Sequence, residues 1–125
     1  MSATTIVGVW RVTTPDAPFA YHMFTFHSDG TFVQSNPPAG NTSTSDTAGM
    51  GIWRVQKDGT VQARFEEYRL DLSDNTVTRG VVDFMLQIKA DRLSGNAAFT
   101  VYDAASGKHL QGPLTTDVSG TRVTF

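Results

Sequence analysis

The chain has 125 residues, a formal net charge of −2, an isoelectric point near 5.8 and no cysteine. This length predicts one domain spanning residues 1–125, the charge offers no basic surface for nucleic acid, and disulfides, thiolate metal sites and cysteine nucleophiles are excluded. The N-terminal stretch MSATTIVGVW lacks the basic start and long apolar run of a signal peptide, and no stretch nears the roughly 18 apolar residues of a membrane span, so we expect a cytoplasmic protein with no membrane partner.

β-Branched and aromatic residues alternate with polar ones along the chain, a pattern typical of strands rather than helices. Turn sequences rich in Asp, Asn, Gly or Pro interrupt this pattern at regular intervals. The predicted strands cover residues 4–13, 19–27, 31–36, 49–56, 60–72, 76–89, 93–103 and 108–125. About eight strands joined by tight turns predict an all-β fold, a single antiparallel up-and-down barrel whose closure removes exposed edges.

One pentapeptide occurs twice, as GVWRV at 8–12 and as GIWRV at 51–55. Each copy leads toward a hairpin with an Asp-Gly turn, at 29–30 and at 58–59, flanked by apolar residues that can pair across the hairpin. We interpret the repeat as two equivalent strand-and-turn units of a pseudo-symmetric sheet.

The segment 36–49, NPPAGNTSTSDTAG, breaks the strand rhythm because it is small, polar and too long for a hairpin turn. Loops of this length in compact domains are usually functional lids or disordered. We expect residues 37–48 to form a mobile flap at one barrel mouth, with plain disorder as the alternative.

A Gly8-Val9-Trp10 strand start, an all-β meander and a late Arg122 together resemble the lipocalin-like (calycin) barrels. In that superfamily the tryptophan closes one barrel end and the arginine packs across its indole, which shields an apolar plug. The stretches TFHSDGT at 25–31 and GMGIWR at 49–54 are similar to a group of small bacterial lipocalin-like proteins. The resemblance implies a central apolar cavity that carries, binds or transforms a small apolar molecule, without the disulfide and secretion signal of extracellular carriers.

The polar pattern inverts within residues 61–72, where apolar side chains occupy odd positions up to 65 and even positions from 68 onward. A β-bulge at Glu66-Glu67 would return all six apolar side chains to one face and leave both glutamates in solvent. A regular strand would instead turn Glu67 and Arg69 inward beside Phe65. Burial or an ion pair would then suit the carboxylate to general acid or base work.

The strand 21–27, YHMFTFH, is apolar on both faces, so two orientations stay open. If Phe24 and Phe26 point inward, His22 does too and His27 faces out. The opposite orientation sends Tyr21 and His27 inward. A neutral imidazole beside a carboxylate would transfer protons near neutral pH, and a structural or surface role is the alternative for each histidine.

These patterns give two sets of candidate residues for the barrel interior. The candidate catalytic residues are Glu67, His22, His27 and Arg69. The candidate ligand-binding residues are Tyr21, Phe24, Phe26, Met50, Trp53, Phe65, Tyr68, Phe84, Phe99 and Tyr102. Tyr102 lies on the face opposite Phe99 and Val101, which favours an exterior position and leaves an interior phenol as the alternative. Met50 has simple core filling as its alternative.

Two functions fit such a barrel. The first is an enzyme without a cofactor, an isomerase, cyclase or lyase that folds a small apolar organic substrate and moves a proton with one acid–base residue. The second is a passive carrier, which needs no buried carboxylate. No metal is expected, because the histidines at 22, 27 and 109 share no ligand spacing. The outward position of Met85 weakly favours a homodimer.

Overall fold

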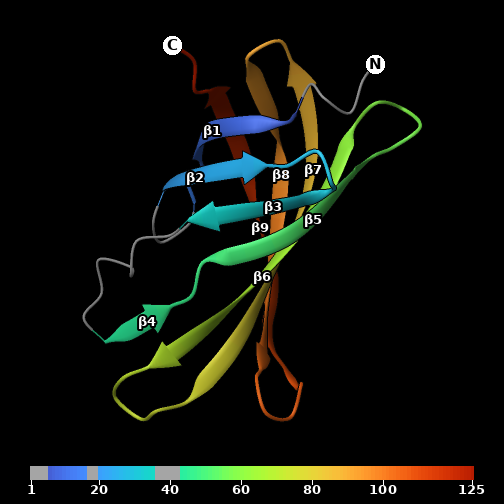
Figure 1. Ribbon diagram of the computed structural model, residues 1–125. Helices are drawn as coiled ribbons and strands as arrows, with labels where there is room; N and C mark the ends of the chain where they lie inside the picture. The colour runs from blue at the N-terminus through green and yellow to red at the C-terminus, as the bar shows by residue number, and fades with distance from the viewer. Residues whose placement is uncertain (1–5, 17–19, 36–42) are drawn as a thin grey trace.

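A computed structural model describes residues 6–16, 20–35 and 43–125 of the chain, and these contain strands and turns but no helix. The strands are β1 (Gly8–Thr13), β2 (Tyr21–Phe26), β3 (Thr31–Ser35), β4 (Thr44–Asp46), β5 (Gly49–Val55), β6 (Val61–Asp71), β7 (Val77–Lys89), β8 (Arg92–Asp103) and β9 (His109–Arg122). The all-β prediction is therefore confirmed (Figure 1).

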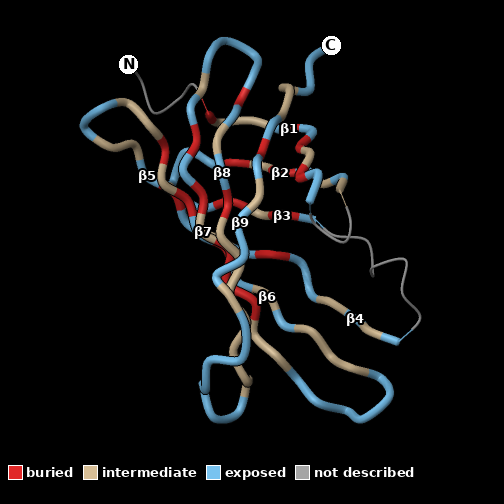
Figure 2. The backbone as a smooth tube through the Cα atoms, turned by 180° about the vertical axis from the view of Figure 1, so that it is seen from behind, coloured by how far each residue is buried: buried red, intermediate tan, exposed pale blue. Residues whose placement is uncertain are grey.

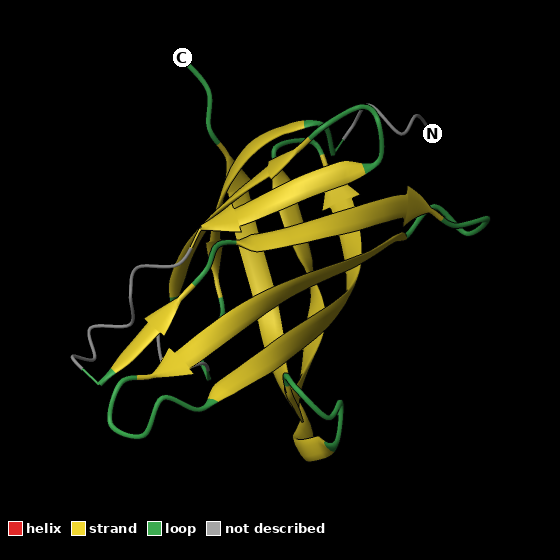
Figure 3. Ribbon diagram, turned by 60° about the horizontal axis from the view of Figure 1, so that its bottom comes forward, coloured by secondary structure: helices red, strands yellow, loops and turns green. Residues whose placement is uncertain are grey.

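Eight of these strands form a closed antiparallel barrel (Figures 1 and 3). The order runs β5-β3-β2-β1-β9-β8-β7, and β6 closes the ring by pairing with both β7 and β5. The ninth strand, β4, lies outside the ring and pairs with the end of β6. This architecture confirms the predicted barrel and is compatible with a lipocalin-like fold.

The strands are not paired along their whole lengths, so the barrel has two different halves. β1 pairs with β9 only from Thr13↔Ser119 to Trp10↔Arg122, whereas β9 itself begins at His109. Similarly, β5 leaves β6 after Met50↔Glu66, and β4 takes its place. We call the part where all eight ring strands pair the closed half. The open half is the sheet β4-β6-β7-β8-β9 beyond it, in the lower part of Figure 1.

A cluster of aromatic rings fills the closed half. Phe24, Phe26, Phe32, Phe65 and Phe84 pack against one another, with ring centroids from 4.7 Å to 6.5 Å apart. The other large buried side chains around them are Ile6, Trp10, Val12, Trp53, Val61, Leu86, Leu93 and Val118. Burial is accordingly concentrated in the closed half, and the hairpin ends of the open half are exposed (Figure 2).

Strand β6 is regular throughout, which overturns the predicted bulge at Glu66-Glu67. Its register with β7 runs without a shift from Val61↔Leu86 to Leu70↔Val77. The regular-strand account therefore holds, and Glu67 and Arg69 share the inward face of Phe65. A bulge would have placed all apolar side chains of residues 61–72 on one face. Tyr68 is instead half exposed on the outer surface.

The irregularity lies on the opposite side of the same ladder. Asp46 pairs with Arg69 and Met50 pairs with Glu66, so residues 47–49 oppose only two residues of β6. Thr47 N donates to the carbonyl of residue 68 over 2.9 Å, and its Oγ1 accepts from the amide of residue 68 over 3.0 Å. The extra residue lets both Asp46 and Gly49 face inward.

The expectation of a mobile flap over residues 37–48 is wrong for residues 44–46. Residues 44–46 form β4, and Leu72 N donates to the carbonyl of Ser43 over 2.7 Å. Residues 36–42 lie outside the described part of the chain. Alternation of small polar residues in this segment concealed a short strand that hydrogen bonds to β6.

The two Asp-Gly turns are built alike. Asp29 Oδ1 accepts from the Thr31 amide and hydroxyl at 2.9 Å and 2.6 Å, and Asp58 Oδ1 accepts from the same groups of Thr60 at 3.0 Å and 2.6 Å. The glycines following them have φ near +89° and +88°, which favours glycine. The pentapeptides are not equivalent, however, because β5 leads directly into its turn whereas β2 separates β1 from the first turn. The predicted pseudo-symmetry therefore extends to the turns alone.

Candidate ligand site in the open half of the barrel

The inward face of the open half is partly polar, unlike the aromatic interior of the closed half. Alternation along β6 carries the inward face from Phe65 to Glu67 and Arg69. Across the ladders, Gly80 of β7 pairs with Glu67, and Phe99 of β8 pairs with Val82, which is the partner of Phe65. Glu67, Arg69 and Phe99 on this face are half buried, so a molecule from solvent can reach them.

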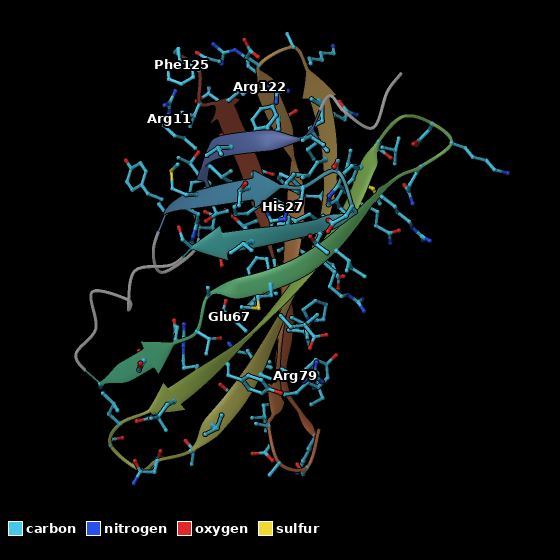
Figure 4. All side chains as sticks on the ribbon, in the orientation of Figure 1. Arg11, His27, Glu67, Arg79, Arg122 and Phe125 are labelled. Carbon is cyan, nitrogen blue, oxygen red and sulfur yellow. The ribbon has the colours of Figure 1, made fainter. Side chains whose placement is uncertain are left out.

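Glu67 lies opposite a glycine and beside an aromatic ring. It pairs with Gly80 across the ladder. A Cβ at Gly80 would lie 3.4 Å from Glu67 Cγ and 2.9 Å from Phe99 Cε1. The stem of Glu67 therefore occupies the space over the glycine backbone, next to the ring edge of Phe99. Figure 4 shows Glu67 on β6 below β5, with Arg79 further down the open half.

Arg69 holds a nearly buried carboxylate. Its Nε and Nη2 donate to Asp46 Oδ1 and Oδ2 over 2.8 Å and 3.1 Å, and the Asp46 side chain is only 4% exposed. Hydrogen bonding to Asp46 raises the pKa of Arg69, and the negative charges of Asp46 and Glu67 raise it further. Partial burial of the guanidinium acts in the opposite direction. Glu67 thus lies within the field of a fixed guanidinium.

His22 lies on the inward face of β2, with Phe24 and Phe26, and belongs to a polar network. Gln34 Nε2 lies 2.9 Å from His22 Nδ1 and 3.1 Å from the Ser35 carbonyl oxygen. An amide nitrogen only donates, so Nδ1 accepts the hydrogen bond, and Nε2–H donates to Thr14 Oγ1 over 3.0 Å. Both ring nitrogens of the neutral imidazole are engaged. This geometry supports a structural role for His22 more directly than a catalytic one.

Gly49 lies between Gln34 of the His22 network and the ring of Phe65, which precedes Glu67 on the inward face of β6. A Cβ at Gly49 would lie 2.6 Å from Gln34 Oε1 and 2.5 Å from Phe65 Cδ1. The missing side chain therefore lets Gln34 of β3 approach the ring two residues before Glu67. The polar groups of β2, β3 and β6 consequently surround the same end of the aromatic core.

Several predicted site residues lie elsewhere. His27 is exposed, with Nδ1 3.1 Å from Thr31 Oγ1. Met50 and Tyr21 are each 71% exposed on the outer surface. The orientation of β2 with Phe24 and Phe26 inward therefore holds, which excludes Tyr21 and His27 from the interior. The interior placement of Met50 was wrong, because β5 presents the alternate residues inward.

Two tyrosines also face outward. Tyr68 is 50% exposed. Tyr102 packs beneath the Arg79 guanidinium, 4.7 Å from the ring centroid, and against His109. The exterior position favoured for Tyr102 therefore holds, and the interior placement of Tyr68 was wrong because the regular β6 sends even positions outward.

The remaining predicted ligand-binding residues do face inward, but most are packed. Phe24, Phe26, Phe65 and Phe84 belong to the aromatic cluster of the closed half. Trp53 is 8% exposed and donates from Nε1 to the carbonyls of His27 and Thr31. Phe99 is half buried and lies beside Glu67 in the open half. Ligand binding by any of them stays a prediction.

Sequence reasoning missed three polar residues of this region. Asp46 was assigned to the flap, so its ion pair with Arg69 could not be expected. Gln34 is 1% exposed and Thr14 is 6% exposed. Gln34 could have been found from the sequence, because it lies two residues after the inward Phe32.

No family model, curated protein or solved structure matches this chain. The described residues include no helix long and apolar enough to cross a membrane. In the same part of the chain, His, Asp and Glu side chains form no group of three or more that could hold a metal ion.

Proposed function

We propose that the open half of the barrel binds a small, mainly apolar organic molecule and that Glu67 transforms it by acid–base chemistry without a cofactor. The reaction class is isomerisation, cyclisation or elimination of the lyase type. We also propose that the chain belongs to the calycin superfamily, on the strength of the Gly-x-Trp strand and its late arginine.

The position of Glu67 carries this proposal. A carboxylate on the inward face, between a glycine and the edge of Phe99, can reach a molecule lying on the aromatic wall. A carrier for molecules without an N–H or O–H group gains nothing from a half-buried carboxylate, because desolvating it costs free energy. A proton-transfer enzyme requires one.

The chemistry follows from the charges around this carboxylate. The carboxylate of Glu67, which interacts with the charge of Arg69, accepts a proton from an acidic C–H of the bound molecule in the proposed reaction. In an isomerisation or a cyclisation, Glu67 then returns that proton to another carbon of the same molecule, and the net change is a shifted double bond or a closed ring. In an elimination, Glu67 gives the proton to the leaving group, which departs with the electron pair of its broken bond while a double bond forms. In each case Glu67 ends with the protons it began with. The rings beside Glu67 hold the substrate in the reactive shape.

A passive carrier is the second candidate function, and the His22 network favours it. Because both nitrogens of His22 are engaged within the protein, Glu67 has no second acid–base group supplied by that histidine. A carrier would use the same half-buried face with Glu67 as an anchoring group for a ligand N–H or O–H.

Solvent deuterium incorporation separates these functions. A panel of small cyclic and aromatic ketones with acidic α C–H bonds is first screened by thermal shift, since a ligand of the native state raises its stability. The ketones that bind are then incubated with the protein in D₂O and analysed by mass spectrometry. We expect deuterium uptake to fall by ~10²–10⁴-fold in Glu67→Gln, with binding retained.

Glu66→Gln is the matched control, because Glu66 is the neighbouring carboxylate on the outer face of the same strand. It should leave both binding and exchange unchanged. Binding without protein-dependent exchange would mean that the protein is a carrier. An equal loss of exchange in Glu67→Gln and Glu66→Gln would mean that Glu67 is not the acid–base residue.

A further inference from the structure

The outer face of β5 and β6 carries an open groove of about 630 Å³, whose lining also includes Thr47, Ala48 and Glu67. Its floor and walls include Met50 and Ile52 of β5 and Arg64, Glu66 and Tyr68 of β6. These positions alternate with the inward ones, so the groove lies on the solvent side of the barrel wall.

Three large apolar side chains gather in this groove. Met50 is 71% exposed, Ile52 is 65% exposed and Tyr68 is 50% exposed. Met50 pairs with Glu66 and Ile52 pairs with Arg64 across the ladder, so the apolar side chains lie beside charged ones. Single exposed apolar residues are ordinary, but a contiguous group rimmed by charges marks an interaction surface.

The outward charged side chains of the groove alternate in sign along β6. Arg64 forms a bidentate ion pair with Asp83, and Glu66 accepts from Arg79 Nη1 over 3.0 Å. Arg64 and Glu66 lie two residues apart on the same face of β6. A surface without net positive charge offers little to nucleic acid or an anionic membrane. The alternating pair is, however, complementary to a second copy of itself.

We propose that this groove is the contact surface of a homodimer in which a second copy of the chain binds face to face. A two-fold axis midway between Arg64 and Glu66 sets Arg64 of one copy against the other copy's Glu66, and it does so twice. The same operation sets Met50 against Ile52 of the other copy. In such an isologous contact, the same patch of each copy buries apolar side chains and pairs opposite charges.

The proposed dimer contact uses the outward side chains of β5 and β6, whereas the proposed reaction uses the carboxylate of Glu67, which also lines the groove. Sedimentation measures the dimer and deuterium exchange measures the reaction, so either proposal can fail without the other.

Oligomeric state is measured by sedimentation velocity between about 1 μM and 1 mM, the range of weak association. We expect a monomer–dimer equilibrium in the unaltered protein. Met50→Glu places a charge in the apolar centre and should weaken dimerisation by at least about tenfold. Met23→Glu is the matched control, because Met23 is an exposed methionine on the outer face of β2, outside the groove. It should leave dimerisation unchanged.

Charge reversal gives a sharper test of the two-fold geometry. Arg64→Glu alone sets Glu against Glu at both contacts, and Glu66→Arg alone sets Arg against Arg, so each variant should be monomeric. An equimolar mixture of the two should recover a dimer, because every contact then joins a glutamate to an arginine. Dispersed amide resonances in NMR spectra establish that each variant is folded before its association is measured.

A chain that stays monomeric up to the highest concentration overturns the proposal. A dimer that is insensitive to Met50→Glu also overturns it, since association would then use another surface. Failure of the mixed charge-reversal variants to associate, when each alone is folded and monomeric, contradicts the proposed two-fold alignment.

Discussion

The guanidinium carbon of Arg122 lies 4.3 Å from the centroid of the Trp10 ring. Trp10 is wholly buried, and its Nε1 donates to the Ile6 carbonyl over 2.9 Å. Arg122 Nη1 donates to the Val7 carbonyl over 2.8 Å, and Nε donates to Asp91 Oδ1 over 3.0 Å. The arginine therefore covers the indole while its own donors remain bonded. This confirms the pairing that the sequence resemblance implied.

Trp10→Ala should lower the free energy of unfolding by about 3–5 kcal/mol, because it removes a large aromatic ring from the core and leaves a cavity. Urea denaturation followed by circular dichroism measures this loss. Val9→Ala is the control, since Val9 is the exposed neighbour on the same strand and its truncation should change the free energy by under about 0.5 kcal/mol. Equal effects of the two substitutions would mean that Trp10 does not close the barrel.

Two bidentate Arg–Asp pairs of this protein differ in burial and should differ in strength. The Asp46 side chain that binds Arg69 is 4% exposed, whereas Asp83, bound to Arg64, is 47% exposed. Asp46→Asn should lower the free energy of unfolding by about 1–3 kcal/mol, because it weakens a desolvated, charge-assisted contact. Asp83→Asn should cost under about 1 kcal/mol. Urea titrations at dilute protein compare them, and the reverse order would contradict the burial argument.

Period-two patterning and turn chemistry were sufficient to predict the eight ring strands. Inward alternation of residues such as Phe24, Phe26 and Phe65 is set by the need to bury one face, and Asp-Gly turns fix where hairpins reverse. Strand β4 escaped because its three residues carry no apolar side chain inward. Its place depends on backbone hydrogen bonds and on the Asp46–Arg69 ion pair, neither of which leaves a hydrophobic pattern.

The candidate site was predictable only in part. The sequence identified Glu67 as anomalous, but it could not distinguish a bulge at Glu66-Glu67 from a regular strand that turns Glu67 inward. The choice depends on which strand carries the extra residue, which here lies in the strand facing β6, among residues 47–49. The outward position of Tyr68 follows from the regular β6.

Acid should destabilise the fold through its aspartate turns. The hydroxyl and amide of Thr60 hold the pKa of Asp58 below its ordinary value, and Thr31 does the same to Asp29. A carboxylate whose pKa is lower in the folded than in the unfolded state stabilises the fold above the unfolded value. That contribution is lost as pH falls through the folded pKa. The free energy of unfolding should therefore decrease below about pH 4.

Thr60→Val tests this origin, because it removes the hydroxyl donor and keeps the backbone amide. Urea titrations between about pH 2 and pH 6 should show a smaller loss of stability on acidification than in the unaltered protein. Thr115→Val, at an exposed position of β9, should leave the pH dependence unchanged. Identical pH profiles for Thr60→Val and the unaltered protein would contradict the turn hydrogen bond as the cause.

Gly49→Ala should destabilise the barrel and disturb the His22 network together. The added methyl group would lie 2.5 Å from Phe65 Cδ1 and 2.6 Å from Gln34 Oε1, so the ring and the amide must move apart at a cost of about 1–3 kcal/mol. Ala48→Ser, at the exposed neighbouring position, should change the free energy of unfolding by under about 0.5 kcal/mol. Displacement of Gln34 also weakens the hydrogen bond that His22 Nδ1 accepts. The imidazole ¹⁵N resonances of His22 report this change directly. Unchanged resonances in a destabilised Gly49→Ala variant would show that Gly49 does not link the packing of Phe65 to the Gln34–His22 hydrogen bond.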